Sequence, residues 1–206
     1  MFYDGLDRLI RTINPDASRT KNSYSYNGSF SNYFGSVAGV VFYQRFTDEE
    51  GNNFDKYTDA VGNLRREVKF IQDDPNLESI ISLITDYKYD SLYRVTQVRT
   101  PEGKNIYYSY DGYSRQSKRI TPDAGQTDYI YDKNNNLIYS QDANQKAASG
   151  TTQKYTFRNY DGLKRLTGIG EAFFGVQDNP LTKLESFLIR MFTARVEKNR
   201  FGQINT

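Results

Sequence analysis

The chain has 206 residues, which is enough for one sizeable domain or one continuous repeat array. It contains no cysteine and no histidine, so disulfides, zinc–cysteine sites, thiol nucleophiles and every Ser-His or Cys-His catalytic pair are excluded. The formal charge is +2, from 27 basic and 25 acidic residues interleaved along the chain, and this balance gives no reason to expect a nucleic-acid partner.

Aromatic residues dominate the apolar part of the composition. They make up 15 of the 37 percentage points of hydrophobic residues, with 18 tyrosines and 13 phenylalanines. Aromatic side chains pack well across pleated sheets, so the composition favours β-structure over an all-helical fold. We expect no signal peptide and no membrane span, because the N-terminus lacks a basic and apolar leader and no apolar run approaches about 18 residues.

The first predicted element is a strand that ends in Tyr3-Asp4 and turns back at Arg8-Leu9. Residues 28–57 interrupt the pattern as an irregular hairpin insertion, with a small-residue loop from Ser29 to Gly39 and strands on either side of the acidic loop 48–53. A degenerate copy of the first motif follows at Asp59. Residues 75–84 begin with Pro75 after a capping Asp74 and have apolar residues at helical spacing, which predicts a short inserted helix.

The central part of the chain repeats the motif at a fixed period. Asp90, Asp111 and Asp132 are 21 residues apart, and each follows a tyrosine. A further copy stands at Tyr160-Asp161. The residues of the motif in the whole chain are Tyr3, Asp4, Arg8, Asp59, Tyr87, Tyr89, Asp90, Arg94, Tyr108, Tyr110, Asp111, Arg115, Tyr129, Tyr131, Asp132, Tyr160, Asp161 and Arg165.

Each period predicts two strands and two turns. Tyrosines two residues apart, such as Tyr87 and Tyr89, lie on one face of a strand. The aspartate ends that strand because its carboxylate can accept backbone N–H groups two residues on, and the arginine four residues later pairs with the aspartate or with backbone carbonyls. A second turn follows at Pro15, Pro101 or Pro122. The predicted fold is therefore mainly β, an antiparallel hairpin meander over residues 1–175.

The last predicted element differs from the repeats. Asn179-Pro180 can start a helix, and apolar residues recur on one face over residues 180–199. We expect residues 176–206 to form a C-terminal helical cap on the array or a linker toward a further region.

The motif, with its Pro-Asp-Gly-like second turn, resembles the YD repeat of Rhs proteins, toxin-complex shell subunits and teneurins over about residues 1 to 170. The resemblance implies a segment of a spiral β-shell, which in bacterial members encloses a C-terminal toxin domain. It implies a non-catalytic structural role in a secreted or cell-surface protein, with the rest of the shell polypeptide or its cargo as partner. No Rhs-core-like signature and no toxin domain follow the repeats, so we expect the chain to be a fragment, a truncated gene product or an excised segment of such a protein.

Two other functions are weighed against this one. The first is a cell-surface adhesion or carbohydrate-binding module that presents Tyr-rich strand faces to glycans, and exposure of the paired tyrosines would favour it. The second is an enzyme, for which the sequence offers no convergent polar cluster. Asp132-Lys-Asn134-Asn-Asn136 is faintly similar to a calcium loop, but Leu137 stands where glycine is required. We therefore predict no catalytic, cofactor or metal site.

Overall fold

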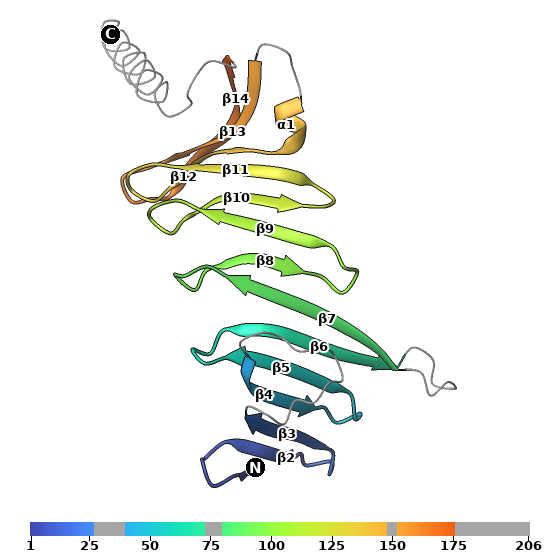
Figure 1. Ribbon diagram of the computed structural model, residues 1–206. Coiled ribbons are helices and arrows are strands. Elements are labelled where there is room, and N and C mark those ends of the chain that lie inside the picture. The colour runs from blue at the N-terminus through green and yellow to red at the C-terminus, as the bar shows by residue number, and fades with distance from the viewer. Residues whose placement is uncertain (27–39, 73–79, 148–151, 176–206) are drawn as a thin grey trace, which may run out of the picture. The chain divides into compact units, whose positions relative to one another are not determined.

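The structure is a computed structural model that describes residues 1–26, 40–72, 80–147 and 152–175 (Figure 1). The chain divides into two units, at residues 1–108 and 109–206. Fourteen strands and one short helix are described. None of the helices in these ranges is long and apolar enough to cross a membrane.

The first unit is an antiparallel meander in which each strand pairs with the next one along the chain. Its strands are β1 (Phe2–Tyr3), β2 (Leu9–Ile13), β3 (Arg19–Tyr26), β4 (Val40–Thr47), β5 (Asn53–Asp59), β6 (Leu64–Gln72), β7 (Ile80–Tyr89), β8 (Val95–Arg99) and β9 (Asn105–Tyr110), whose last two residues belong to the second unit.

The second unit repeats this arrangement and adds the helix. Its elements are β10 (Gln116–Thr121), β11 (Gly125–Tyr131), β12 (Leu137–Gln141), α1 (Ala143–Ala147), β13 (Thr152–Tyr160) and β14 (Leu166–Gly175). The predicted antiparallel hairpin meander is confirmed within each unit.

The two units bury different kinds of side chain. In the second unit Tyr139, Tyr155 and Phe174 pack edge to face with ring centroids 5.4 to 6.2 Å apart, beside Ile138. This aromatic cluster agrees with a composition poor in aliphatic residues. In the first unit the fully buried side chains are Val68 and a carboxylate, Asp55.

One glycine of the second unit is required by a close approach. Gly170 lies opposite Phe157 across β13 and β14, and a Cβ at Gly170 would stand 2.7 Å from the Phe157 ring. The ring packs over the glycine backbone, which only a residue without a side chain permits.

The helix predicted at residues 75–84 is wrong where the structure describes it. Residues 80–84 belong to β7, where Ile81 and Ile84 pair with residues of β6, and residues 73–79 lie outside the described ranges. Strand pairing overrides the helical spacing because β6 offers a complete antiparallel partner over seven residues. The predicted C-terminal helix at 180–199 and the cap or linker at 176–206 also lie outside the described residues.

The described part of the 28–57 insertion is an antiparallel hairpin with a register shift between Val40 and Phe42. β4 and β5 pair from Val40 to Thr47 without leaving the meander, and the loop 29–39 is outside the described ranges. The short helix α1 was not predicted. Its signal was present, because Asp142 Oδ1 accepts the Gln145 N–H at 2.8 Å and Gln145 Oε1 accepts the Asp142 N–H at 3.0 Å, which is a reciprocal capping box.

Candidate functional site: the repeated tyrosine–aspartate turn

The aspartate of each motif lies at a chain reversal and holds the turn together with one carboxylate oxygen. At Asp90, Oδ1 accepts the N–H of Leu92 at 2.9 Å and the N–H of Arg94 at 3.0 Å. The backbone closes around it, with the Asp90 N–H donating to the Arg94 carbonyl and the Tyr93 N–H donating to the Asp90 carbonyl. The same pattern occurs at Asp4, Asp48, Asp59, Asp111, Asp132 and Asp161.

The second carboxylate oxygen accepts the side chain four residues later. The Nε of Arg8, Arg94, Arg115 and Arg165 lies 2.7 Å from Oδ2 of the aspartate in its own turn. Where the motif has asparagine in place of arginine, at Asn52, Asn63 and Asn136, the side-chain amide donates to the same oxygen at 2.8 to 3.0 Å. The polar residue at this position therefore makes a second hydrogen bond across the turn, and arginine makes that bond an ion pair.

These bonds lower the pKa of the carboxyls of Asp4, Asp48, Asp59, Asp90, Asp111 and Asp161. At Asp90 and Asp161 the backbone N–H of the arginine contributes most and its guanidinium next; at Asp4 the guanidinium of Arg8 comes first. At Asp111 burial raises the pKa, but the bonds from Arg115 together outweigh it, so the net shift is again downward. The charged carboxylate is thus the form that the turn stabilises.

The residue three positions after the turn aspartate adopts a left-handed backbone. It is glycine in two of the seven aspartate turns, Gly51 and Gly62, and in the others it is Asp7, Tyr93, Ser114, Asn135 or Lys164, with φ between 57° and 66°. A register shift follows on the paired strands, so that Tyr89 lies opposite Val95 and Tyr131 opposite Leu137. This is the geometry of a type I turn followed by a bulge, the common three-residue hairpin connection.

The tyrosine before the aspartate bonds to the preceding strand. Its hydroxyl donates to the carbonyl of the residue that opens that strand: Tyr89 to Leu64 at 2.8 Å, Tyr131 to Gln116 at 3.0 Å and Tyr160 to Leu137 at 3.1 Å. In β3 the hydroxyl of Tyr24 makes the same bond to Leu9 at 3.0 Å. The acceptor is in each case five residues after a turn aspartate, so one copy is bonded to the next through this phenol.

The turn arginine completes this contact. The guanidinium carbon of Arg115 lies 4.8 Å from the centre of the Tyr131 ring, and that of Arg8 lies 4.4 Å from the centre of the Tyr24 ring. After Asp59, where asparagine occupies the usual position, Arg65 lies 5.9 Å from the Tyr89 ring instead. Burial raises the pKa of Tyr89 and Tyr131, as expected for phenols that are partly withdrawn from water.

The other tyrosines of the motif, two residues earlier, lie on the same strands. Tyr87, Tyr108 and Tyr129 are all half-buried, as is Tyr110, which directly precedes Asp111. The Tyr87 hydroxyl donates to Glu67 Oε1 on the neighbouring strand at 2.8 Å. Tyr3 differs from them, with 56% of its surface exposed.

One turn of the repeat type was missed in the sequence. Asp48 makes the full set of bonds described above. The side-chain amide of Asn52 donates to its second oxygen, and Gly51 has the left-handed conformation. Thr47 and Asn53 stand where other copies have tyrosine and an apolar residue, which concealed it. The spacing Asp-x-x-Gly-Asn, shared with the turn at Asp59, was the available signal.

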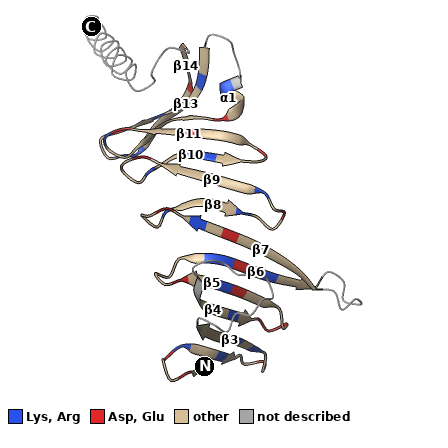
Figure 2. Ribbon diagram, viewed as in Figure 1, with Lys and Arg blue, Asp and Glu red and all other residues tan. Residues whose placement is uncertain are grey.

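The first unit also carries a charged cluster on one face of its sheet. Arg45 binds the buried Asp55 through two bonds of 2.6 and 2.7 Å, and the Tyr43 hydroxyl donates to the same carboxylate at 3.1 Å. Arg66 binds Asp86 in the same manner two strands on, at 2.5 and 2.9 Å. Figure 2 shows basic and acidic segments close together on β6 and β7. These cross-strand pairs leave each carboxylate satisfied, which suits a structural role.

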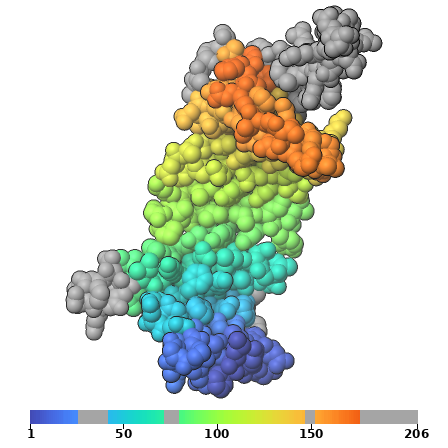
Figure 3. Space-filling model, turned by 180° about the vertical axis from the view of Figure 1, so that it is seen from behind, coloured from blue at the N-terminus to red at the C-terminus, as the bar shows by residue number. Residues whose placement is uncertain are grey.

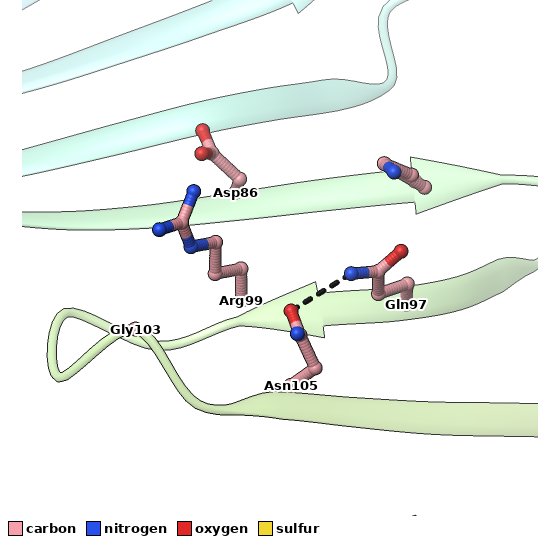
Figure 4. Close-up of a pocket in the computed structure, with 6 residues that line it drawn as sticks. Asp86, Gln97, Arg99, Gly103 and Asn105 are labelled. Atoms are coloured by element: carbon pink, nitrogen blue, oxygen red, sulfur yellow. Dashed lines mark hydrogen bonds between the residues drawn. The ribbon is translucent and has the colours of Figure 1, made fainter.

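A small polar cavity of about 280 Å³ lies next to this cluster. Its lining comprises Asp86, Lys88, Gln97, Arg99, Gly103 and Asn105. Figure 4 shows the Arg99 guanidinium directed toward Asp86, and Gln97 donates to Asn105 at 2.8 Å. Because the Asp86 oxygens already accept Arg66, the cavity can hydrogen-bond a polar molecule but does not present a free carboxylate as a general base.

Within the described ranges, no group of three or more acidic residues is placed to hold a metal ion. Asp132 and Asn136, which suggested a faint likeness to a calcium loop, are bonded to each other and to the turn backbone.

Comparison with known proteins shows which solved structures have a similar fold. No protein-family model and no curated protein sequence matches the chain. Solved structures do: the Tc holotoxin pore of Photorhabdus luminescens, with a TM-score of 0.61 at 16% identity over 86% of this chain, and TcdB2-TccC3, with the same score and identity over 82%. A TcdB2-TccC3-Cdc42 structure matches with a TM-score of 0.59. The chain spans 8% of each of these chains. It therefore has the fold of a segment of a Tc toxin β-shell, in agreement with the resemblance to YD repeats.

Proposed function

We propose that this chain is a structural segment of YD-repeat wall within a larger bacterial polypeptide that encloses or presents a C-terminal, toxin-like cargo. The observation that carries the proposal is the use of the motif tyrosines. In each described contact the phenol donates to the preceding copy and, at Tyr24, Tyr89 and Tyr131, lies beneath an arginine. A residue used in this way in several copies of the motif serves to join strands.

The fold supports the same role. An antiparallel meander grows by adding hairpins, and the match to Tc toxin chains covers most of the described strands but a small share of those chains. A larger polypeptide, secreted or displayed at the cell surface, is the setting in which such a segment makes a wall. No catalytic step is part of the proposal, because its motif residues are bonded to one another.

The alternative, a glycan-binding module with Tyr-rich strand faces, has less support. The paired tyrosines are half-buried and their hydroxyls, where the bonds are described, are occupied. Among the described residues the exposed tyrosines are Tyr3, Tyr93, Tyr107 and Tyr113. Tyr3 ends the two-residue strand β1, and the other three stand in turns or on the other face of β9. Glycan-array binding lost on Tyr107→Ala with the fold retained would favour this alternative.

A graft tests the proposed function. Residues 1–175 would replace the matching segment of TcdB2-TccC3, and electron microscopy would show whether a closed particle still forms. We expect assembly, and we expect the same graft carrying Tyr89→Ala and Tyr131→Ala to assemble poorly because two joints between copies are removed. A wild-type graft that folds, by proteolytic resistance, but prevents closure of the particle contradicts the proposal.

A further inference from the structure

The polar cavity of the first unit lies on one face of β7, β8 and β9. Strand pairing places Asp86 opposite Arg99 and Arg99 opposite Asn105, so these three side chains share a face. Lys88 and Gln97 form the next pair on that same face, two residues along each strand. In Figure 3 the green atoms of β7 and β8 follow the cyan atoms of β5 and β6 within the first unit. The cavity therefore continues the charged cluster of this unit.

Two cations border the cavity without a described partner. Lys88 and Arg99 are exposed, and among the described residues neither side chain makes an ion pair or a hydrogen bond. The Arg99 guanidinium is directed toward Asp86, but both oxygens of that carboxylate accept Arg66, at 2.5 and 2.9 Å. The cavity therefore carries more positive than negative charge, which attracts an anion.

The two cations are spaced to share one anionic group. Lys88 stands opposite Gln97, and Arg99 is two residues beyond Gln97, so the two cations are diagonal neighbours. Diagonal residues of an antiparallel pair are about 7–8 Å apart, which is within reach of long side chains. A carboxylate or phosphate between them can accept from both, and it matches the fork of the guanidinium.

The two amides of the cavity leave one donor and one acceptor for a ligand. Gln97 Nε2 donates to Asn105 Oδ1 at 2.8 Å. Asn105 Nδ2 and Gln97 Oε1 make no other hydrogen bond among the described residues, so one can donate to a ligand and the other can accept from it. A hydroxyl group does both and matches this pair. The volume of about 280 Å³ suits one small molecule and not a polymer chain.

We propose that this cavity binds a small hydroxylated anion, a sugar acid or a sugar phosphate, with the anionic group between Lys88 and Arg99 and a hydroxyl at Gln97 and Asn105. Such a site goes beyond the proposed wall function, because it uses none of the tyrosines that join the copies. It also differs from a Tyr-rich glycan face. Tyr107 is exposed and stands opposite Gln97, but it does not line the cavity.

Titration of the full chain with gluconate and with glucose 6-phosphate, followed by NMR of the backbone amides, tests the site. We expect shifts centred on Lys88, Arg99 and Asn105 and a Kd on the order of 1 mM, because exposed ion pairs contribute little each. The tighter of the two ligands identifies the anionic group. Glucose, which has no charge, should not bind, and acetate, which has no hydroxyl, should bind about threefold more weakly than gluconate. Raising NaCl to about 0.5 M should weaken binding several-fold.

Variants locate the site. Lys88→Gln and Arg99→Gln should each weaken binding about fivefold. Lys133→Gln, the matched control, removes the same charge from an exposed turn residue that does not line the cavity, and it should leave binding unchanged, as should Tyr107→Ala.

The inference is overturned if neither anion binds, if glucose binds as tightly as they do, or if binding is indifferent to Lys88→Gln and Arg99→Gln. Binding that is lost in Tyr107→Ala with the fold retained also overturns it, since the ligand would then lie on the tyrosine and not in the cavity. Because the tyrosine contacts between copies are unchanged in Lys88→Gln and Arg99→Gln, the graft in TcdB2-TccC3 should assemble with or without these changes.

Discussion

The turns at Asp111 and Asp161 have the same backbone, the same carboxylate bonds and the same 2.7 Å bond from arginine, but different surroundings. Arg115 lies between Tyr113 and Tyr131 and donates to the Asp132 carbonyl, while Arg165 extends into solvent. The aspartate–arginine pair therefore forms without any help from the next copy. The tyrosine contact is a separate interaction that exists only where another strand follows.

The largest effect on both turns should come from acid, which acts on six turn carboxylates at once. The pKa values of Asp4, Asp48, Asp59, Asp90, Asp111 and Asp161 lie below their ordinary value of 3.8 in the folded chain. The unfolded chain then binds more protons in acid than the folded chain. This contribution to stability is complete above 3.8 and is lost as the pH falls through the lower folded values.

Thermal unfolding followed by circular dichroism between pH 6 and pH 2 checks this expectation. The midpoint should stay level down to about pH 4.5 and then decrease. Asp111→Asn and Asp161→Asn should each flatten the decrease. A midpoint that rises in acid would show that the turn carboxylates are not stabilised in their charged form.

The next largest effect is expected at the Asp111 copy, which has a tyrosine partner, whereas the Asp161 copy has none among the described residues. Tyr131→Ala removes the ring beneath Arg115 and the bond to the Gln116 carbonyl, and should lower the free energy of unfolding by about 2–3 kcal/mol. Tyr113→Ala is the matched control, because Tyr113 also lies near Arg115 but is 81% exposed, and it should cost less than about 0.5 kcal/mol. Urea denaturation measures both, and equal losses would mean that the hydroxyl bond and ring burial contribute nothing.

The two arginines provide the direct test of the comparison. Arg115→Ala should cost about 2 kcal/mol, because it removes the contacts to Asp111, Tyr131 and the Asp132 carbonyl together. Arg165→Ala removes only an exposed ion pair and should cost less than about 0.5 kcal/mol. Urea denaturation of both variants would show the difference. Similar losses of unfolding free energy would mean that arginine stabilises the chain through its own turn and not through the tyrosine of the next copy.

The smallest effect should come from the left-handed residue of each turn. Ser114 and Lys164 have φ of 61°, which glycine adopts without the steric cost that a Cβ brings. Ser114→Gly and Lys164→Gly should each stabilise the chain by about 0.5 kcal/mol, after the greater entropy of glycine in the unfolded chain is subtracted. Gly103→Ala, at φ 77°, should be destabilising and serves as the reverse control.

Much of the fold and of the motif geometry could be predicted because the relevant interactions are short in sequence. The bond from Arg94 to Asp90 joins residues four apart, and Tyr87, Lys88 and Tyr89 at the end of β7 alternate between half-buried and exposed, as in a pleated sheet. The helix expected over residues 75–84 was wrong at its C-terminal part because the same apolar residues also suit a strand, and only β6 decides between the two.

The burial of the Asp55 carboxylate could not be predicted from the sequence. Its partners, Arg45 and Tyr43, lie on the preceding strand, and no feature of the sequence Asn-Phe-Asp-Lys distinguishes a buried carboxylate from a solvated one. The turn at Asp48 was missed for a related reason, since its tyrosine is absent although its backbone and carboxylate bonds are those of the other copies.

The sequence by itself determined where the chain reverses and which side chain holds each reversal, because a carboxylate reaches N–H groups two and four residues away whatever the rest of the chain does. Only the tertiary structure decided which strand each tyrosine meets, since the phenols of Tyr24, Tyr89, Tyr131 and Tyr160 bond to carbonyls 15 to 25 residues earlier. It also decided which arginine is covered and which is left at an open edge, because that depends on the neighbour of each strand and not on the turn.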